Sequence, residues 1–305
     1  MKRLTVTVLA AVGVLALVGL MPRARDLARV AIKVAEGNSP HCPLANALDA
    51  PSHAARLTRT KDRMLAGFKL ERRDPAGLEL WSTPRGKFWI PADNEFTLAF
   101  NLAEQEVGIY RAGEVGVRSG DVVIDCGANV GVFTRTALAA GAGLVVAVEP
   151  LPANLECLRR NFRDEIAAGS VILYPEGVWD REARLTLRVD PHNTAAASFV
   201  MGKQDWQPVV EVPLNTIDKL VRELKLPRVD FIKMDIEGAE PKAIAGARET
   251  LARFQPRLAI SAYHEPDHPV AIPAAVRAAA PGYHMRCGPC AEAGGIIRPD
   301  VLLFW

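Results

Sequence analysis

VVIDCGANVG, residues 122–131, predicts a buried strand that runs into a tight glycine turn. The apolar residues before Asp125 suit a strand covered on both faces, and Gly127 and Gly131 let the backbone approach a ligand closely. The next apolar run, LVVAVEP, ends on an acid, Glu149, which lies 22 positions after Gly127. At that spacing an acid on the second strand accepts hydrogen bonds from both ribose hydroxyls. The pattern therefore predicts a nucleotide or adenosyl cofactor site.

The spacing inside the turn distinguishes two cofactors. A dinucleotide site has G-x-G-x-x-G, so that a helix N-terminus meets a pyrophosphate. Here the order is Asp125, Gly127, Asn129 and Gly131, with an acid in place of the first glycine. A carboxylate repels pyrophosphate but pairs with the ammonium group of S-adenosylmethionine. The turn therefore favours adenosylmethionine over NAD, with Asp125, Gly127, Asn129, Gly131 and Glu149 as the expected cofactor residues.

Three segments together resemble a known family. IDCGANVGVFT, VEPLPANLECLRRNF and FIKMDIEGAE are similar to the motifs of the FkbM family of S-adenosylmethionine-dependent methyltransferases. The resemblance runs from about Trp81 to the C-terminus and includes the upstream segment LAEQEVGIY. It implies a Rossmann-like class I methyltransferase fold. It also implies O-methylation of a hydroxyl group on a glycan, a lipid-linked sugar or a secondary metabolite.

The alternation of strands and helices predicts a doubly wound sheet. We expect a mostly parallel seven-stranded sheet with helices on both faces, preceded by a hairpin (LELWST and KFWIP) and a helix from Phe96 to Arg111. Two further strands, RLTLRV and VVEVPL, flank a polar loop at 190–207 that is expected to hold the methyl acceptor. The seven expected sheet strands are Val122–Cys126, Leu144–Glu149, Val171–Tyr174, Phe231–Met234, Leu258–Ala262, and the pair near Tyr283–Cys287 and Val301–Trp305.

The first residues predict a membrane anchor. Leu4 to Met21 carry no charge, and eighteen helical residues span roughly 27 Å at about 1.5 Å each, close to the thickness of a bilayer core. Basic residues are more numerous after the segment than before it, which predicts that the following domain stays in the cytoplasm, on a bacterial-type inner membrane. A cleaved signal peptide and export is the alternative. The chain thus divides into an anchor (1–34), a linker with a short helix (35–70) and a methyltransferase domain (71–305).

Polar residues gather where ligands bind in such sheets, beyond the carboxyl ends of the strands. Asp235 ends the fourth strand and is expected to orient the methyl acceptor or the ammonium group of the cofactor. His264 follows the fifth strand, and imidazole suits proton removal at neutral pH, so His264 is the expected general base. Asp180, on the loop after the third strand, is a further candidate for contact with the adenine of the cofactor. Glu240 is expected to have a structural role, because its negative charge interacts favourably with the dipole at the N-terminus of the next helix.

The sequence does not predict a metal site or a redox-active cysteine pair. Asp235 and Glu237 lack a full set of oxygen ligands, so we expect no divalent metal. The pair Cys287 and Cys290 has the spacing C-x-x-C, yet the residues after it are glycine-broken and predict a turn between the last two strands. Cys42 is expected in a solvated linker, and Cys126 and Cys157 are expected to be buried, reduced thiols.

Balanced charge restricts the partners. The formal net charge is +2 over 305 residues, so nothing in the charge indicates a nucleic-acid partner. A small-molecule, glycan or lipid acceptor and the membrane are the expected partners. Two other readings remain: a membrane-tethered adenosylmethionine-binding protein without turnover, and an NAD-linked oxidoreductase, which the missing G-x-G-x-x-G disfavours.

Overall fold

The computed structural model describes residues 22–190, 193–198 and 207–305. The expected anchor, Leu4 to Met21, lies outside these residues, as does most of the stretch 191–206 where the acceptor was expected. Among the helices of the described ranges, none is both long and apolar enough to span a bilayer.

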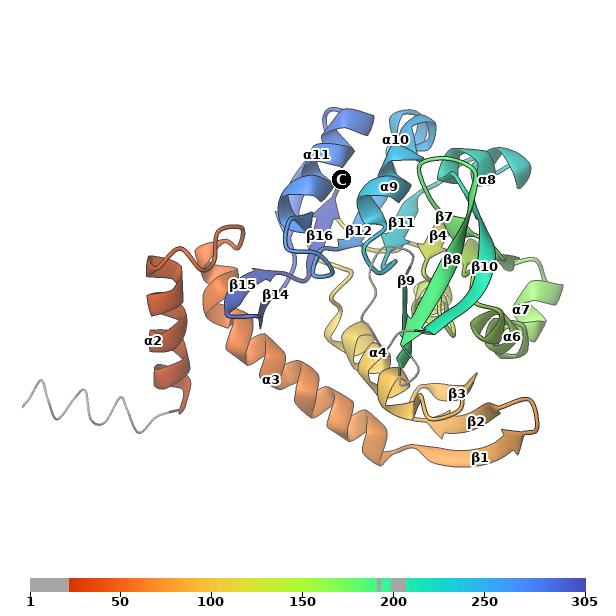
Figure 1. Cartoon of the computed structure of the whole chain (residues 1–305), viewed down its shortest axis with the longest axis horizontal. Helices are drawn as coiled ribbons and strands as arrows, with labels where there is room; N and C mark the ends of the chain where they lie inside the picture. The colour runs from red at the N-terminus through yellow and green to blue at the C-terminus, as the bar shows by residue number, and fades with distance from the viewer. Residues whose placement is uncertain (1–21, 191–192, 199–206) are drawn as a thin grey trace, which may run out of the picture.

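A seven-stranded sheet forms the centre of the molecule (Figure 1). Five of its strands are parallel neighbours. The sixth, β16, is antiparallel to both β12 and β13, so β13, the seventh, runs in the same direction as the five. The predicted seven-stranded, mostly parallel sheet is therefore confirmed, and the antiparallel β16 makes it a mixed sheet. In spatial order its strands are β13 (Met285–Cys287), β16 (Val301–Phe304), β12 (Arg257–Ser261), β11 (Phe231–Met234), β4 (Val122–Cys126), β5 (Leu144–Val148) and β6 (Val171–Tyr174).

Helices cover both faces of this sheet, as the sequence predicted. Every residue of β4 is buried, because alternate side chains enter two different hydrophobic clusters. One face carries α8 (Ile217–Glu223), α9 (Glu240–Ala245), α10 (Arg248–Phe254) and α11 (His268–Ala279). The other carries α5 (Val132–Ala139), α6 (Pro152–Asn161) and α7 (Arg163–Ala167), and α4 (Glu95–Val107) packs beside α5.

Two smaller sheets flank the central one. The predicted hairpin is confirmed as β2 (Leu78–Thr83) and β3 (Gly86–Pro91), and β1 (Lys69–Asp74) adds a third strand that was not predicted. The two predicted strands beside the polar loop pair antiparallel as β8 (Ala183–Asp190) and β10 (Gln207–Asn215). With β7 (Gly177–Val178) and β9 (Asn193–Ser198) they form a four-stranded sheet in the order β7-β10-β8-β9.

The segment expected to be a linker with a short helix is instead an arm of two helices (Figure 1). It consists of α2 (Pro22–Ala35) and α3 (Leu44–Ala66), which has 23 residues. The prolines suggested a linker, but Pro43 stands directly before α3 and Pro51 is accommodated inside it. Helix α3 also buries four side chains, which stabilise it through tertiary packing.

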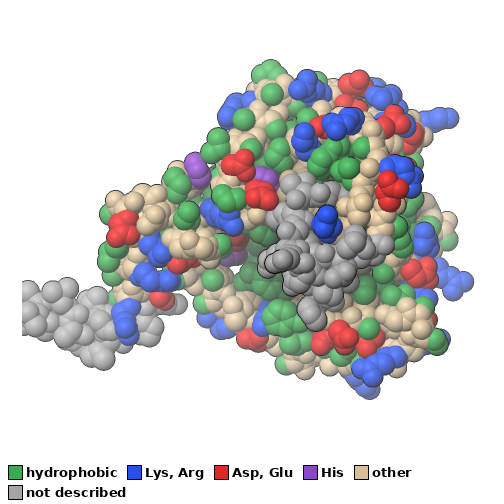
Figure 2. All heavy atoms as spheres, in the orientation of Figure 1, with side chains coloured by type: hydrophobic (Ala, Val, Ile, Leu, Met, Phe, Trp, Pro, Cys, Tyr) green, Lys and Arg blue, Asp and Glu red, His purple; other side chains and the backbone are tan. Residues whose placement is uncertain are grey.

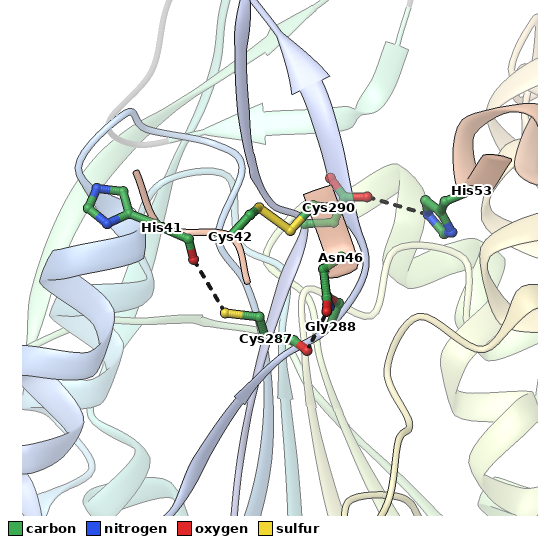
Figure 3. Close-up of a disulfide and its surroundings, with 8 residues drawn as sticks. His41, Cys42, Asn46, His53, Cys287, Gly288 and Cys290 are labelled. Carbon is green, nitrogen blue, oxygen red and sulfur yellow. Dashed lines mark hydrogen bonds and ion pairs between the residues drawn. A yellow bond between two sulfur atoms is a disulfide. The ribbon is translucent and has the colours of Figure 1, made fainter. Parts of the chain in front are cut away.

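A disulfide joins this arm to the C-terminal region (Figure 3). Cys42, before α3, is bonded to Cys290, the first residue of a hairpin formed by β14 (Cys290–Ala293) and β15 (Ile296–Pro299). The predictions of a solvated Cys42 and of a simple turn between the last two strands were therefore wrong. Cys126 and Cys157 are buried free cysteines, as predicted, and Cys287 is also free.

Charged side chains of both signs are interspersed over the described surface in Figure 2. Basic residues do not gather there into one large patch, in keeping with the small net charge.

Candidate active site

The glycine turn after β4 has a shape that only glycine permits at two positions. Gly127 has φ +77°, and a Cβ atom there would lie 2.0 Å from the backbone oxygen of Asp235. Gly131 has φ +93°, and a Cβ would lie 2.1 Å from the ring of Phe162. The turn therefore packs directly against the end of β11. This close approach brings the two main sequence motifs together.

A cavity of about 400 Å³ opens where these strand ends meet. It lies between the glycine turn, the ends of β11 and β12, and helix α4. The residues that line it combine aromatic and charged side chains: Phe96, Thr97, Phe100, Asn101, Glu104, Gln105, Tyr110, Gly127, Ala128, Asn129, Val132, Phe133, Lys233, Asp235, Glu237 and Tyr263.

Asp235 lines this cavity, where the sequence placed it. Its Oδ2 accepts a hydrogen bond from the Tyr110 hydroxyl (2.9 Å) and its Oδ1 accepts one from the Tyr263 hydroxyl (3.2 Å). Burial raises the pKa of Asp235, but the positive charges of Lys233 and His264 outweigh burial and lower it below the ordinary value. Asp235 is therefore a fixed carboxylate directed at the cavity.

Asp125 does not line the cavity. It is fully buried, its Oδ2 accepts a hydrogen bond from the Thr134 hydroxyl (2.7 Å), and its Oδ1 lies 3.3 Å from Nζ of Lys233. The two residues are register partners on the parallel strands β4 and β11. Lys233 also donates to the backbone oxygen of Gly127 (2.9 Å) and lines the cavity itself. Asp125 thus meets a cation of this chain, and Lys233 is the charge that faces the ligand space.

Glu149 supports the glycine turn from the second strand. Its two oxygens accept hydrogen bonds from the backbone N–H groups of Asn129 (2.8 Å) and Leu151 (2.9 Å). Burial raises its pKa to about 7 although both bonds lower it. The side chain is 5% exposed and is not part of the cavity wall, whereas Gly127 and Asn129 are. Asp180 lies away from the cavity, where it pairs with Lys242 and Arg181.

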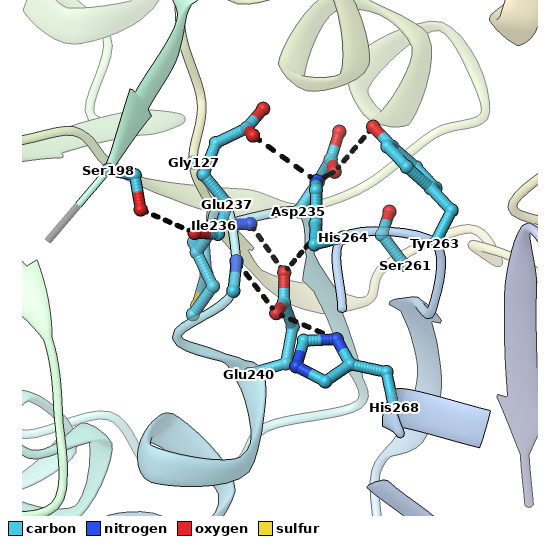
Figure 4. Close-up of polar contacts among 12 residues, drawn as sticks. Gly127, Ser198, Asp235, Ile236, Glu237, Glu240, Ser261, Tyr263, His264 and His268 are labelled. Carbon is cyan, nitrogen blue, oxygen red and sulfur yellow. Dashed lines mark hydrogen bonds and ion pairs between the residues drawn. The ribbon is translucent and has the colours of Figure 1, made fainter. Parts of the chain in front are cut away.

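His264 lies behind the cavity wall rather than on it (Figure 4). Its side chain is 2% exposed, with Nε2 at 3.4 Å from Asp235 Oδ1 and 3.6 Å from Glu237 Oε2. Burial lowers its pKa, yet the neighbouring carboxylates of Glu237 and Glu240 outweigh burial and raise it well above the ordinary value. His264 is not among the residues that line the cavity, so it does not meet an acceptor bound there, and the geometry does not support the prediction that His264 is the general base.

Glu240 turns back over the loop between β11 and α9. Its oxygens accept hydrogen bonds from the backbone N–H groups of Ile236 (2.9 Å) and Gly238 (3.1 Å), so it holds the turn in place. The same turn sets Glu237 at φ +53° with its side chain at the cavity. The expected structural role of Glu240 at the start of α9 agrees with these contacts.

Several cavity residues were not predicted from the sequence, among them Lys233 and Tyr263 and, from one upstream segment, Glu104 and Tyr110. The last two belong to the segment LAEQEVGIY, which carried part of the family resemblance but gave no indication of what it faced. Glu104 lines the cavity from α4, and burial, followed by the charge of Asp235, raises its pKa well above the ordinary value. The sequence feature that could have identified Glu104 and Tyr110 is an acid and a tyrosine six residues apart, near the end of a helix predicted to pack on the cofactor domain.

A family model and a curated protein are similar to this chain in sequence. The model of the methyltransferase FkbM domain matches residues 125–279, just over half of the chain. The 31-O-demethyl-FK506 methyltransferase FkbM of Streptomyces tacrolimicus is 27% identical, over 44% of this chain and 62% of that protein. The chain thus spans less than two thirds of the length of this curated relative.

Solved structures show the same kind of similarity. The methyltransferase FkbM from Methylobacillus flagellatus is 18% identical, with a TM-score of 0.48 over 85% of this chain and 61% of that one. Fibrillarin from Aeropyrum pernix, solved with bound S-adenosyl-L-methionine, is 13% identical, with a TM-score of 0.39 over 77% of this chain and 97% of that one. By the match over residues 125–279, this chain belongs to the FkbM methyltransferase domain family.

Proposed function

We propose that this protein transfers a methyl group from S-adenosylmethionine to a hydroxyl oxygen. The observation that carries the proposal is the position of Asp235, a carboxylate held by two tyrosine hydroxyls on the cavity wall, directly beside the glycine turn. Family membership supports the methyl transfer. The hydroxyl acceptor is supported by the presence of a carboxylate where a proton has to be removed.

The residues of the turn fit the cofactor. Gly127 and Gly131 let the turn pack closely against Asp235 and Phe162, and this packing leaves the backbone of Gly127, Ala128 and Asn129 on the cavity wall, where an adenosyl group can approach it. Lys233 would bind the carboxylate of the methionine part, and Glu104 would bind its ammonium, in place of the role expected for Asp125. When bound, adenosylmethionine supplies an electrophilic methyl group on a sulfonium centre. Glu149 fixes the turn that receives it.

The chain contributes alignment and proton removal. With the cofactor held by Lys233 and Glu104, its methyl group would pass to the acceptor oxygen with the thioether as leaving group, and Asp235 would take the hydroxyl proton. Tyr110 and Tyr263 hold both oxygens of Asp235 and so fix the direction of the acceptor. Much of the rate enhancement in such a displacement comes from positioning. His264 supports Asp235 from behind.

We propose a sugar-containing acceptor from the cell envelope. Two exposed aromatic side chains, Phe96 (55% exposed) and Phe100 (37% exposed), lie one helical turn apart on α4 at the cavity. Aromatic rings beside carboxylates suit a ring with an apolar face and hydroxyl groups. The membrane anchor expected at Leu4 to Met21 would place the site near lipid-linked glycans.

The test uses labelled adenosylmethionine and cell-envelope extracts. We expect wild-type protein to label a component of the extract, and Asp235→Asn to lower the rate about 100-fold or more while binding adenosylmethionine with similar affinity. Asp164→Asn, at an exposed position on α7, is the matched control and should behave as wild type. Undiminished transfer by Asp235→Asn would remove Asp235 from this role. Cofactor binding without labelling of any extract would favour a binding protein without turnover.

We also propose that the catalytic domain faces the cytoplasm, where adenosylmethionine is made, on a membrane anchored by Leu4 to Met21. The basic residues after that segment support this orientation. The disulfide between Cys42 and Cys290 opposes it, because such bonds persist mainly in oxidising compartments. A reporter active only in the periplasm, fused after Lys33, should be inactive, and one active in the cytoplasm should work. The reverse result would place the domain outside the cytoplasm.

A further inference from the structure

A buried cluster of one glutamate and two histidines lies next to Asp235 and Glu237 (Figure 4). It consists of Glu240, the first residue of α9, with His264 after β12 and His268, the first residue of α11. Their side chains are 0%, 2% and 4% exposed. One ligand atom from each lies within 4.8 Å of the others. Three separate elements thus bring two imidazoles and a carboxylate to one point in the interior.

The imidazole nitrogens of this cluster lack hydrogen bonds. Both nitrogens of His264 and Nδ1 of His268 are buried without a hydrogen-bond partner. His264 Nδ1 lies 2.9 Å from Glu240 Oε1, and His268 Nδ1 lies 3.5 Å from Glu240 Oε2, but neither approach is aligned as a hydrogen bond. Buried polar atoms are nearly always satisfied, so two such nitrogens beside the carboxylate of Glu240, His264 Nδ1 and His268 Nδ1, indicate a missing partner.

Glu240 is prepared to serve as a ligand. The backbone N–H groups of Ile236 and Gly238 fix its two oxygens and use only part of their capacity, since an ionised carboxylate offers about four lone-pair directions. The remaining lone pairs are available on the side of the two imidazoles.

The far side of His264 has the arrangement of partners that metal-bound histidines have. Nε2 faces Asp235 Oδ1 at 3.4 Å and Glu237 Oε2 at 3.6 Å, while Nδ1 faces Glu240. Metal-ligating histidines generally direct their second nitrogen at a carboxylate in this way, which fixes the ring. An ion at Nδ1 takes the place of the proton there and leaves the Nε2 proton directed at Asp235.

We propose that Glu240, His264 and His268 bind one divalent transition-metal ion, and that zinc suits the site best. Two imidazoles and one carboxylate form a common zinc ligand set with one position left for water. In the described ranges this is the cluster of at least three His, Cys, Asp or Glu side chains whose ligand atoms converge. The ion lies behind Asp235 rather than in the cavity, so it positions the catalytic carboxylate through His264 and does not touch the methyl group.

The two histidines have the spacing of a known zinc motif but not its helical structure. His264 to His268 spells H-E-x-x-H, a zinc motif when it lies on one helix. Here α11 begins only at His268 and Pro266 stands between the two, so the pair converges through a turn. The third ligand, Glu240, comes from the motif KMDIEGAE, and the sequence predicted for it only a structural role at the start of the next helix.

The test is metal analysis of the full chain, with no need for the acceptor. Protein incubated with zinc and then gel-filtered should retain about one ion per chain, and its melting temperature should rise with zinc and fall with a chelator. Cobalt in place of zinc should give the visible absorption of a four-coordinate ion. His268→Ala and Glu240→Gln should lower the retained zinc at least about tenfold. His284→Ala, a histidine beside Trp305 and outside the cluster, should retain it.

Two results would overturn the proposal. Wild-type protein that retains no zinc or cobalt, with a melting temperature unaffected by either, would show that the cluster is an ion pair between Glu240 and protonated histidines. Equal zinc content in wild type and in Glu240→Gln would place the ion elsewhere. Should His268→Ala fail to fold, the wild-type stoichiometry and the Glu240→Gln comparison still decide. Neither result bears on adenosylmethionine binding, which is measured separately.

Discussion

At the scale of single residues, the interior of this protein contains a charge pair that connects the two sequence motifs. Asp125 of the glycine turn and Lys233 of KMDIEGAE are both nearly inaccessible and lie 3.3 Å apart. Burial lowers the pKa of Lys233, but Asp125 outweighs it, and the net pKa is raised. Lys233 is therefore charged, and its removal would leave Asp125 buried without its cation.

The pair predicts a strongly non-additive pattern of stability. Lys233→Met alone should lower the free energy of unfolding by about 3–5 kcal/mol, because an uncompensated buried charge remains. Adding Asp125→Asn to that variant should restore most of the loss, although cofactor binding should stay weak because Lys233 faces the cavity. Urea denaturation of the two single variants and the double variant measures this. Simple additivity of the two losses would show that the residues do not interact.

Residue positions were predicted better than side-chain directions. Strand order and the glycine turn placed Asp125, Glu149, Asp235 and His264 at one edge of the sheet, and the structure has them there. The sequence does not show which neighbours compete for each carboxylate. Asp125 is paired by the lysine opposite it in register, and Glu149 by two backbone N–H groups. Both partners come from tertiary contacts that a spacing rule does not contain.

At the scale of elements, the glycine turn is the part of the fold most dependent on residue type. Gly127 and Gly169 both have φ +77°, but a Cβ at Gly127 meets the backbone of Asp235, whereas one at Gly169 meets nothing within 4 Å. A substitution at either position would cause the same backbone strain, but only a substitution at Gly127 would also cause a clash. They form a matched pair for separating strain from close approach.

Gly169→Ala should cost about 1–2 kcal/mol of stability from backbone strain alone. Gly127→Ala should cost a further 1–3 kcal/mol or so, because the turn has to move away from β11. Only Gly127→Ala should abolish adenosylmethionine binding. Thermal denaturation and calorimetry on both variants measure the difference. Equal behaviour of the two variants would mean that the contact between the turn and Asp235 is unimportant.

The central sheet could be predicted from the sequence because most of its strands are short apolar runs, and three of them, β4, β5 and β11, are followed directly by glycine or an acidic residue. The helix α3 could not, since its prolines resemble those of a linker and its stabilising contacts are with α4 and β14, far away in the sequence. The hairpin β14–β15 was missed for a similar reason: its strands have four residues each, and both pack on the arm.

At the scale of the whole molecule, the N-terminal arm is held to the C-terminal region by a small separate core. Val30, Ala47 and Ala50 from the arm pack with Cys290 and Ile297. Within this core Cys42 and Cys290, 248 positions apart, are disulfide-bonded. The side chain of Asn46 adds a hydrogen bond to the backbone oxygen of Gly288 (2.7 Å) (Figure 3). The arm that follows the expected membrane segment is thus fixed to the catalytic domain.

Loss of this disulfide should destabilise the protein measurably. Cys42→Ser should lower the free energy of unfolding by about 2–5 kcal/mol under oxidising conditions, since the bond closes a long loop. Cys287→Ser, the same substitution at a free cysteine, should have a much smaller effect. Under reducing conditions wild type and Cys42→Ser should become alike. A wild-type protein insensitive to reductant, with Cys42 found as a free thiol by peptide mapping, would contradict the bond.

The central claim is that the cavity beside the glycine turn receives S-adenosylmethionine. Calorimetric titration of the folded full chain with adenosylmethionine and, separately, with NAD tests it most directly. We predict one adenosylmethionine per chain and no heat from NAD. Glu149→Gln, which disturbs the N–H bonds that hold the turn, should weaken adenosylmethionine binding by about 1.5–3 kcal/mol, while the exposed Glu211→Gln should not. Binding of NAD, or no binding of adenosylmethionine by properly folded protein, would contradict the account.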